Sequence, residues 1–363
     1  MNINENKISD IDKEIIKYIN ENDVKDYSKI MENDSNISTI LALSSMRENI
    51  VSWYPFEPDC TILEIGANFG EITGELCKKA KRVVSLESID EKRNAILKRH
   101  KNKKNLSLIA NIDEINETFD YITIIGMEKI TDNYLELLEE IKKYLNSNGK
   151  ILLATNNRFA IKNLTTSNFE EKKYKLYTID ELLKGLDEIG FKNRKVYYPM
   201  TDYNLTNAIY TDSRTMQMDE VSRNIVYNDE SSIKFREENN LYFDLLKHNV
   251  EFKSIANSFF IEIFNGDYID NNIKLAVFSN MRKEQFRVKT IVQGENVYKY
   301  AIGEKGFEHI KSAKTNIDIM HKVNLKTLDT YDENRIISKF VNAETLDNVI
   351  LRTFEKNRKD AVD

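Results

Sequence analysis

Residues 61–70, Thr-Ile-Leu-Glu-Ile-Gly-Ala-Asn-Phe-Gly, are the stretch that decides the fold. Four of the first five residues are apolar or β-branched, which is typical of a short strand buried on both faces. Glycines then interrupt the pattern, and Ile72, Leu76 and Ala80 follow at fourfold spacing, which predicts one face of a helix. A strand, a glycine turn and a helix form the first unit of a nucleotide-binding α/β domain.

A second predicted strand, residues 82–86, ends at Glu87. This glutamate follows Gly66 by about twenty residues, the distance at which such folds place a carboxylate that accepts both ribose hydroxyls. We therefore expect Glu87, with Ser88 beside it, in a cofactor site.

The glycine pattern indicates which nucleotide binds. A dinucleotide fingerprint requires glycine at positions 66, 68 and 71, but Asn68 and Glu71 occupy two of them. A side chain and a negative charge would then lie where a pyrophosphate has to sit. This pattern disfavours a nicotinamide-dependent oxidoreductase, while a turn that binds no ligand remains an alternative.

The remaining motif, E-x-G-x-x-x-G at residues 64–70, resembles the first motif of the class I methyltransferases that use S-adenosylmethionine. Further pieces, in order, resemble a bacterial branch of that family met in gene clusters for surface or flagellar glycans. The family usually has Gly-x-Gly where this chain has Gly66-Ala67-Asn68, and a longer loop than residues 160–176. The matching pieces are W-Y-P-F at 53–56, L-E-I-G at 63–66, S-x-x-x-x-R-N-A-I near 88–96, R-H at 99–100, F-D-Y-I-T-I-I-G at 119–126, N-N-R-F at 156–159, Y-Y-P-M-T-D-Y at 197–203 and N-S-F at 257–259.

The resemblance implies an α/β, Rossmann-like methyltransferase sheet of seven strands, with ligands at its carboxyl edge. It implies that S-adenosylmethionine is the cofactor, bound by Glu64, Gly66, Asn68, Gly70, Glu87, Ser88, Asn111, Ile112 and Gly126. The candidates for the base that takes the acceptor's proton are Glu128, Asp202 and Tyr203. The acceptor-binding candidates are Tyr54, Asn157, Arg158 and Tyr198; Tyr54 is alternatively a core residue, and Arg158 alternatively pairs with Asp202 to fix a lid. The strands are expected at 61–65, 82–86, 106–110, 119–125, 151–154, 196–198 and 258–263.

Several helix boundaries are expected from local signals. One helix runs from residue 37 towards residue 50, and another, starting near Tyr134, ends at Gly149. Ser88 and Asp90 are expected to cap the helix that follows Glu87. Its basic end, residues 98–101, suits the negative end of the helix dipole and is interpreted as a solvated face.

Composition narrows the class of protein. The 363 residues carry 53 basic and 59 acidic side chains. The resulting net charge of −6 argues against non-specific binding of nucleic acid. Two cysteines form no disulfide framework, so we expect a reducing cytoplasm. The abundance of Asn, Lys and Ile is typical of an AT-rich bacterial genome. No apolar run approaches the roughly 18 residues of a membrane span. We find no pair of His or Cys at metal-ligand spacing around His100.

We expect three parts: residues 1–50 as a helical segment, residues 51–268 as the methyltransferase domain with a lid at 204–254, and residues 269–363 as an appendage. The appendage resembles the N-lobe of kinase-like folds. It has a hairpin over 291–300 that carries Lys299, a helix with Glu308 and His309, and a hinge-like stretch at 338–346. Because no catalytic loop or magnesium-binding aspartate follows, we expect no phosphotransfer.

The sequence thus favours an enzyme that methylates a hydroxyl or amine on a sugar or amino acid of a bacterial glycan or its precursor. Other glycan-biosynthesis enzymes are its expected partners. The alternative is a non-catalytic scaffold module of a glycan-assembly complex, with a degenerate cofactor site. Asn68, standing where the family has glycine, is the residue that favours the scaffold.

Overall fold

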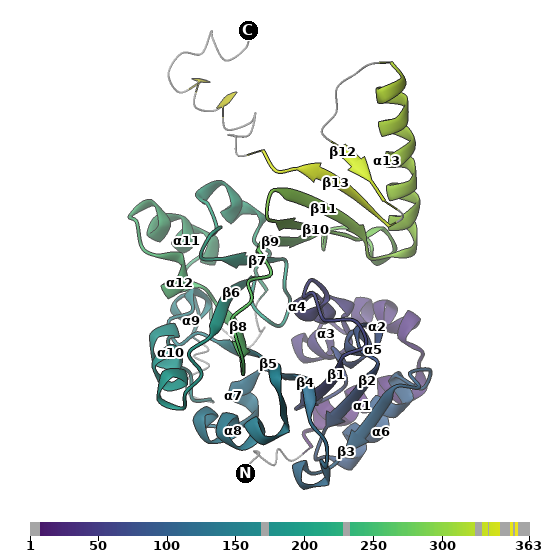
Figure 1. Ribbon diagram of the computed structural model, residues 1–363, viewed down its shortest axis with the longest axis vertical. Coiled ribbons are helices and arrows are strands. Elements are labelled where there is room, and N and C mark those ends of the chain that lie inside the picture. The colour runs from purple at the N-terminus through teal and green to yellow at the C-terminus, as the bar shows by residue number, and fades with distance from the viewer. Residues whose placement is uncertain are drawn as a thin grey trace.

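The computed structural model describes residues 8–167, 174–227, 233–323, 329–332, 334–341, 349–350 and 353–354. Their strands form one sheet of 13 strands in the order β12-β13-β11-β10-β9-β7-β6-β8-β5-β4-β1-β2-β3. Helices cover both faces of the half that holds β1 to β5, and the strands after β9 extend the sheet to one side (Figure 1). The strands are β1 Thr61–Ile65, β2 Arg82–Leu86, β3 Leu106–Ile109, β4 Phe119–Ile125, β5 Leu145–Asn156, β6 Arg194–Met200, β7 Ala208–Thr211, β8 Ser258–Phe264, β9 Ile273–Phe278, β10 Val288–Gln293, β11 Asn296–Ala301, β12 Asp329–Tyr331 and β13 Arg335–Lys339.

The helices alternate with the strands through the first half of the sheet. The α-helices are α1 Asp10–Glu21, α2 Tyr27–Asn33, α3 Ile37–Leu43, α4 Asn49–Ser52, α5 Thr73–Lys79, α6 Asp90–Arg99, α7 Met127–Ile130, α8 Tyr134–Ile141, α9 Ile161–Thr165, α10 Ile179–Glu188, α11 Glu238–Lys247, α12 Phe252–Ile255 and α13 Glu304–Lys322. The 3-10 helices are η1 Val24–Asp26, η2 Ser45–Glu48, η3 Ile112–Glu114, η4 Lys142–Tyr144, η6 Met218–Arg223 and η7 Glu284–Phe286.

Strand direction sets where a ligand can bind. Strands β3, β2, β1, β4 and β5 are parallel, and β8 lies antiparallel between β5 and β6. The chain leaves β1 towards β2 and β3 on one side, and returns to β4 and β5 on the other. The strand order therefore reverses between β1 and β4, and in open α/β sheets ligands bind outside the carboxyl ends of the strands at that point.

All seven predicted strands are present, as β1 to β6 and β8. The strand count was wrong because the sheet continues through β7 and β9, which pair with each other in the antiparallel sense. Four residues, Ala208–Thr211, form β7 inside the segment predicted as a lid, and all four are buried. So short a strand in a polar segment gives little periodic signal. The segment 204–254 is therefore partly sheet, and not solely a lid.

The predicted hairpin and helix near the C-terminus are confirmed as β10, β11 and α13. In the hairpin, Lys299 pairs with Thr290, and β10 also pairs with β9. The hairpin thus continues the same sheet. Residues 342–346 of the predicted hinge-like stretch lie outside the described residues.

Two predicted helices end earlier than expected. The helix begun at Ile37 stops at Leu43, because the Ser44 hydroxyl accepts the Met46 amide and starts the separate turn η2. The helix begun at Tyr134 ends at Ile141, and Gly149 lies inside β5 instead of closing that helix.

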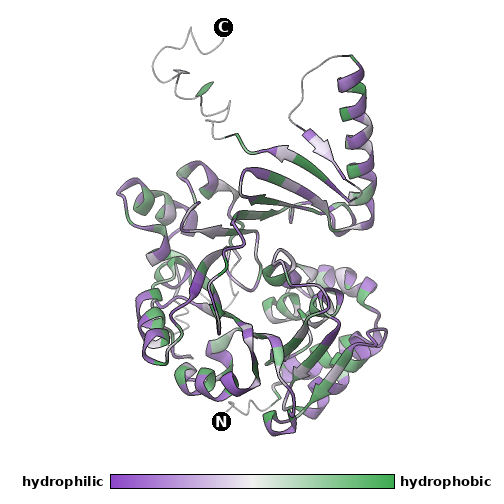
Figure 2. Cartoon of the chain, in the orientation of Figure 1, coloured by the Kyte–Doolittle hydropathy of each residue, from purple (hydrophilic) through white to green (hydrophobic). Residues whose placement is uncertain are grey.

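Two apolar layers hold the helices to the sheet. One includes Ile65, Ile124 and Leu138, under α8, and the other includes Ile62, Leu76 and Trp53, under α4 and α5. Hydrophobic residues concentrate on the strands and on the inner sides of the helices (Figure 2). Among the helices of the described ranges, none combines the length and apolar character needed to cross a bilayer.

Candidate cofactor and active site

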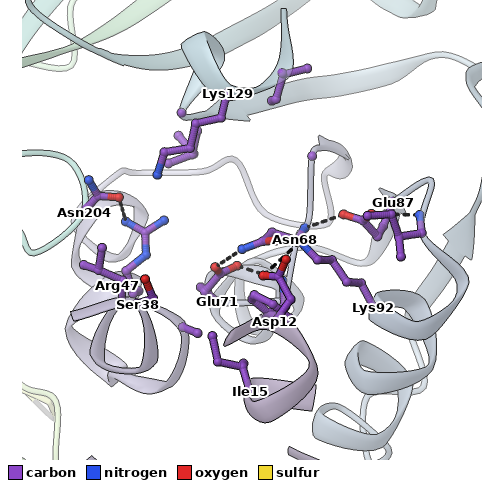
Figure 3. Close-up of a pocket in the computed structure, with 18 of the residues that line it drawn as sticks. Asp12, Ile15, Ser38, Arg47, Asn68, Glu71, Glu87, Lys92, Lys129 and Asn204 are labelled. Carbon is purple, nitrogen blue, oxygen red and sulfur yellow. Dashed lines mark hydrogen bonds and ion pairs between the residues drawn. The ribbon is translucent and has the colours of Figure 1, made fainter. Parts of the chain in front are cut away.

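A cavity of about 430 Å³ opens at the carboxyl ends of β1, β2 and β4. Five residues predicted at the cofactor line it, namely Gly66, Asn68, Glu87, Ser88 and Gly126. Residues of α1 and α3 line the opposite wall, and the polar side chains gather around the opening (Figure 3). Ser88 lies in the cavity but does not cap α6, since no side chain caps that helix.

The turn after β1 has the shape that its glycines allow. Gly66 and Gly70 have φ angles of 77° and 72°, and Asn68 has a φ of 50°. Asparagine tolerates this left-handed conformation better than most residues, so replacing glycine with Asn68 preserves the turn. The backbone amides of Gly66 and Ala67 both donate to the Leu86 carbonyl, which fixes the turn against β2.

Glu87 is a buried carboxylate at the end of β2. Its Oε2 accepts a hydrogen bond from the backbone amide of Asn68 at 2.9 Å. Its Oε1 accepts one from the backbone amide of Ile89 at 3.0 Å. Burial raises the pKa of Glu87, although these amides and Lys92 oppose the shift. An ionised carboxylate has about four acceptor positions. Glu87 can therefore hold the turn and still accept two hydroxyls of a ribose.

A chain of polar side chains crosses the cavity beside Glu87. The Lys92 ammonium donates to Oδ1 of Asn68 at 2.7 Å, and the side-chain amide of Asn68 donates to Oε1 of Glu71 at 2.7 Å. Lys92 also lies 3.8 Å from Asp12, which ties α1 to this chain (Figure 3). Asn68 and Glu71, the two residues that depart from the dinucleotide fingerprint, are thus both part of this chain of contacts.

Only part of the basic end of α6 is the solvated face that was predicted, because Lys98 and Lys101 are exposed but Arg99 and His100 are not. Arg99 donates to the carbonyls of Ala42 and Phe69 at 2.7 and 3.1 Å. His100 contacts the carbonyl of Gly70 at 2.8 Å, and burial lowers the pKa of His100 to about 4. Both side chains therefore point inward and join the glycine turn to the N-terminal helices.

Four residues predicted to bind the cofactor do not line the cavity. Glu64 lies beneath it, and its Oε2 accepts the hydroxyls of Thr73 and Ser85 at 2.7 and 2.6 Å. Burial raises the pKa of Glu64 to about 7. The other three are Gly70, whose face is covered by His100, Asn111, which caps η3, and Ile112, which is buried in the core.

The predicted bases Glu128 and Tyr203 lie together behind the cavity wall. The Tyr203 hydroxyl donates to Oε1 of Glu128 at 2.7 Å, and the Asn156 amide donates to the same oxygen at 3.0 Å. Both side chains are fully buried. Gly126 separates the Tyr203 hydroxyl from the cavity, and a Cβ at Gly126 would lie 3.1 Å from that oxygen. A substrate at Gly126 is thus next to this pair.

Asp202 joins the same network from the other side. Its Oδ2 accepts the Lys162 ammonium at 3.0 Å and the Tyr227 hydroxyl at 2.5 Å. Burial favours the protonated form, but these two groups hold the pKa of Asp202 below its usual range. Lys162 also donates to Asn156 at 3.0 Å. Asp202 is therefore an ionised support of the network and does not line the cavity.

The predicted acceptor residues are placed elsewhere, and none of them lines the cavity. Their polar groups bind other parts of the protein, which is the physical reason for this correction. The Tyr54 hydroxyl donates to Glu262 within an aromatic core, and the Tyr198 hydroxyl donates to Asp212. The Asn157 amide donates to the carbonyls of Ser254 and Ala256. The Arg158 guanidinium pairs with Glu181 at 2.7 Å, and not with Asp202.

Several polar residues that line the cavity were not predicted, among them Arg47, Lys129 and Asn204. Arg47 comes from η2, Lys129 from α7 and Asn204 from the connection between β6 and β7. No motif marks them in the sequence, because only the folded chain brings these segments together.

Comparisons with known proteins agree with this geometry. Residues 32–196 match a family model described as a methyltransferase domain. A search of curated protein sequences found no significant match. Three solved structures are similar. A phosphoethanolamine N-methyltransferase of Haemonchus contortus, in complex with phosphoethanolamine and S-adenosylhomocysteine, has 17% identity and a TM-score of 0.30 over 43% of this chain and 35% of its own. A plantazolicin methyltransferase complexed with S-adenosylhomocysteine has 15% identity and a TM-score of 0.37, over 71% of this chain and 99% of its own.

A possible histamine N-methyltransferase of Thermotoga maritima has 14% identity and a TM-score of 0.39 over 69% of this chain and 99% of its own. This chain thus spans about a third of the length of the first of these proteins and nearly all of the other two. Similarities this weak carry no information about the acceptor. Residues 32–196 of this chain are thus similar to the methyltransferase domain family.

Proposed function

We propose that this chain transfers the methyl group of S-adenosylmethionine to a hydroxyl or amine on a sugar or amino-acid component of a bacterial surface or flagellar glycan. The cavity at the carboxyl ends of β1, β2 and β4 carries this proposal, because it joins Gly66, Glu87 and Gly126 within the matched domain. The glycan acceptor rests on the resemblance of the motifs alone.

The residues present fit this cofactor. Glu87 retains acceptor positions for the ribose hydroxyls, and Gly66 and Gly126 present bare backbone to the cavity. When bound, S-adenosylmethionine supplies a methyl group activated for in-line displacement. The chain then has to orient the acceptor, exclude water and remove one proton, and positioning provides most of the rate.

The Glu128–Tyr203 pair is the group best placed to take the proton. A carboxylate that accepts a tyrosine hydroxyl can receive a proton through that hydroxyl, provided the acceptor reaches the wall at Gly126. Asn156 orients Glu128 from the other side, and Lys162 links Asn156 to Asp202. In this arrangement Asp202 acts only through its neighbours.

Calorimetry with S-adenosylhomocysteine tests the assignment of the cavity. Glu87→Ala is expected to weaken binding by about 1.5–3 kcal/mol, the range for hydrogen bonds to a charged group. Glu117→Ala, at a half-buried glutamate that pairs with Arg82 at the far end of β2, is the matched control and should leave affinity unchanged. Equal affinities of wild type and the Glu87 variant would remove Glu87 from the site and contradict the proposal.

A further inference from the structure

Arg47 is a buried cation on the cavity wall. Its side chain belongs to η2 and is only 7% exposed. The Nη1 atom donates to the carbonyl of Tyr203 at 3.2 Å and to Oδ1 of Asn204 at 2.9 Å. Both acceptors are neutral. These two bonds therefore fix the orientation of the guanidinium and leave its charge uncompensated.

The opposite edge of the guanidinium is formed by Nε and Nη2, and no residue of the described ranges binds it. Within the described ranges, Nε is buried with no hydrogen-bond partner, and the printed bonds of Arg47 all come from Nη1. The adjacent Glu48 pairs with Lys78 instead. A buried guanidinium without a counter-charge is costly, and this edge matches the two oxygens of a carboxylate.

The charges in the cavity are divided between two ends. Arg47 and Lys129 both lie by the Tyr203 ring, with the guanidinium carbon 5.9 Å and the ammonium 5.6 Å from its centroid. Both point into the side of the cavity opposite Glu87 (Figure 3). The other end holds two carboxylates, Glu71 and Glu87, which already accept hydrogen bonds, and one ammonium, that of Lys92. The basic end is thus suited to an anionic group of a ligand.

We propose that Arg47 forms a carboxylate-binding subsite of this cavity. Its Nε and Nη2 donate to the two oxygens of a ligand carboxylate, and Lys129 adds a second positive charge. The inference rests on the proposed function and deepens it. Two ligands carry this chemistry: the amino-acid end of the methyl donor and an anionic group on the acceptor.

Two nucleosides distinguish these sources. S-adenosylhomocysteine has the amino-acid carboxylate, whereas 5′-methylthioadenosine keeps the nucleoside and thioether but lacks the amino-acid group. If the carboxylate belongs to the donor, Arg47→Gln lowers the affinity for S-adenosylhomocysteine by about ten- to hundredfold. The same variant leaves the affinity for 5′-methylthioadenosine unchanged. Arg47→Lys recovers only part of the loss, because it retains the charge without the planar fork.

If the carboxylate belongs to the acceptor, both nucleosides bind Arg47→Gln as they bind wild type. Acetate then raises the melting temperature of the wild type saturated with S-adenosylhomocysteine, and does not do so for Arg47→Gln. Arg82→Gln, which removes an exposed arginine at the start of β2, should behave as wild type in every measurement.

The proposal fails if Arg47→Gln lowers the affinities for both nucleosides equally. It also fails if the variant and wild type have the same nucleoside affinities and the same response of the melting temperature to acetate. If Arg47→Gln does not fold, Arg47→Lys is compared with wild type by the same criteria. A wild-type protein that binds neither nucleoside would instead contradict the proposed function. The two failures are therefore distinguishable.

Discussion

The Nε2 atom of His100 lies 2.8 Å from the carbonyl oxygen of Gly70, the last residue of the turn beside the cavity. Since the carbonyl can only accept, Nε2 donates its proton. The ring fills the space left by two glycines: a Cβ on Gly70 or on Gly74 would lie 2.9 or 2.8 Å from it. His100 thus acts as a positioning residue, which holds the turn without contacting the cavity.

Replacing His100 with alanine should loosen the turn and weaken cofactor binding. We expect a loss of about 1–3 kcal/mol in the free energy of unfolding, from one buried hydrogen bond and the vacated ring space. S-adenosylhomocysteine affinity, measured by calorimetry, should fall as well. His248→Ala, at an exposed histidine of the described chain, is the control and should change neither quantity. A destabilised His100 variant with full affinity would show that the turn does not depend on this contact.

Glu64 should make stability depend on pH. Burial raises the pKa of Glu64 from 4.5 to about 7 in the folded protein. The folded state therefore binds the proton more tightly than the unfolded state. The resulting stabilisation is complete below the unfolded pKa and is lost as the pH rises through about 7.

Glu64→Gln cannot titrate, so its melting temperature supplies the reference. The melting temperature of wild type minus that of the variant is expected to fall between about pH 5 and about pH 8, with up to about 3 kcal/mol of stability involved. A difference that stays constant, or rises with pH, would mean that Glu64 is ionised in the fold.

Tyr203→Phe separates proton transfer from cofactor binding. The change removes the hydroxyl that donates to Glu128 and keeps the ring beside Arg47 and Lys129. The affinity for S-adenosylhomocysteine should stay unchanged. The rate at which the enzyme forms S-adenosylhomocysteine, measured with a reactive sugar or amino acid from an acceptor panel, should fall by about 10²–10⁴-fold. Tyr210→Phe, on β7, is the matched control. Unchanged turnover in Tyr203→Phe would remove the pair from the mechanism.

The hairpin that carries Lys299 is expected to have no part in either chemistry. We predict that Lys299→Ala methylates at the wild-type rate and that neither protein transfers phosphate from ATP, as checked with radiolabelled ATP and magnesium. Magnesium-dependent phosphotransfer that disappears in Lys299→Ala would show that this region works as a kinase.

The part of the fold that could be predicted is the part with strong local signals. The strand and turn at residues 61–70 and the strand ending at Glu87 have buried apolar runs bounded by glycine or by a carboxylate. Their packing side by side follows from the βαβ connection alone. β7, with four residues, and the antiparallel strands beyond it depend on long-range pairing, which periodicity does not report.

The site divides in the same way. Residues next to a strand end, such as Gly66, Glu87 and Gly126, were predicted to face the ligand and do line the cavity. Asn157 and Arg158 also follow a strand, but their side chains turn towards α12 and α10. Arg47 was missed because a lone arginine in a helical segment is ordinarily a surface residue. Only the contact of η2 with Tyr203 and Asn204 makes Arg47 part of the site.

The most direct test is a calorimetric titration of the wild-type protein with S-adenosylhomocysteine, and separately with NAD⁺. The cavity is expected to bind S-adenosylhomocysteine with micromolar affinity, because Glu87 can accept its ribose hydroxyls. It is expected to show no heat with NAD⁺, because the Asn68 side chain and the Glu71 carboxylate stand where the dinucleotide fingerprint has glycine. Binding of NAD⁺, or of neither ligand, would contradict the proposal that this chain is an S-adenosylmethionine-dependent methyltransferase.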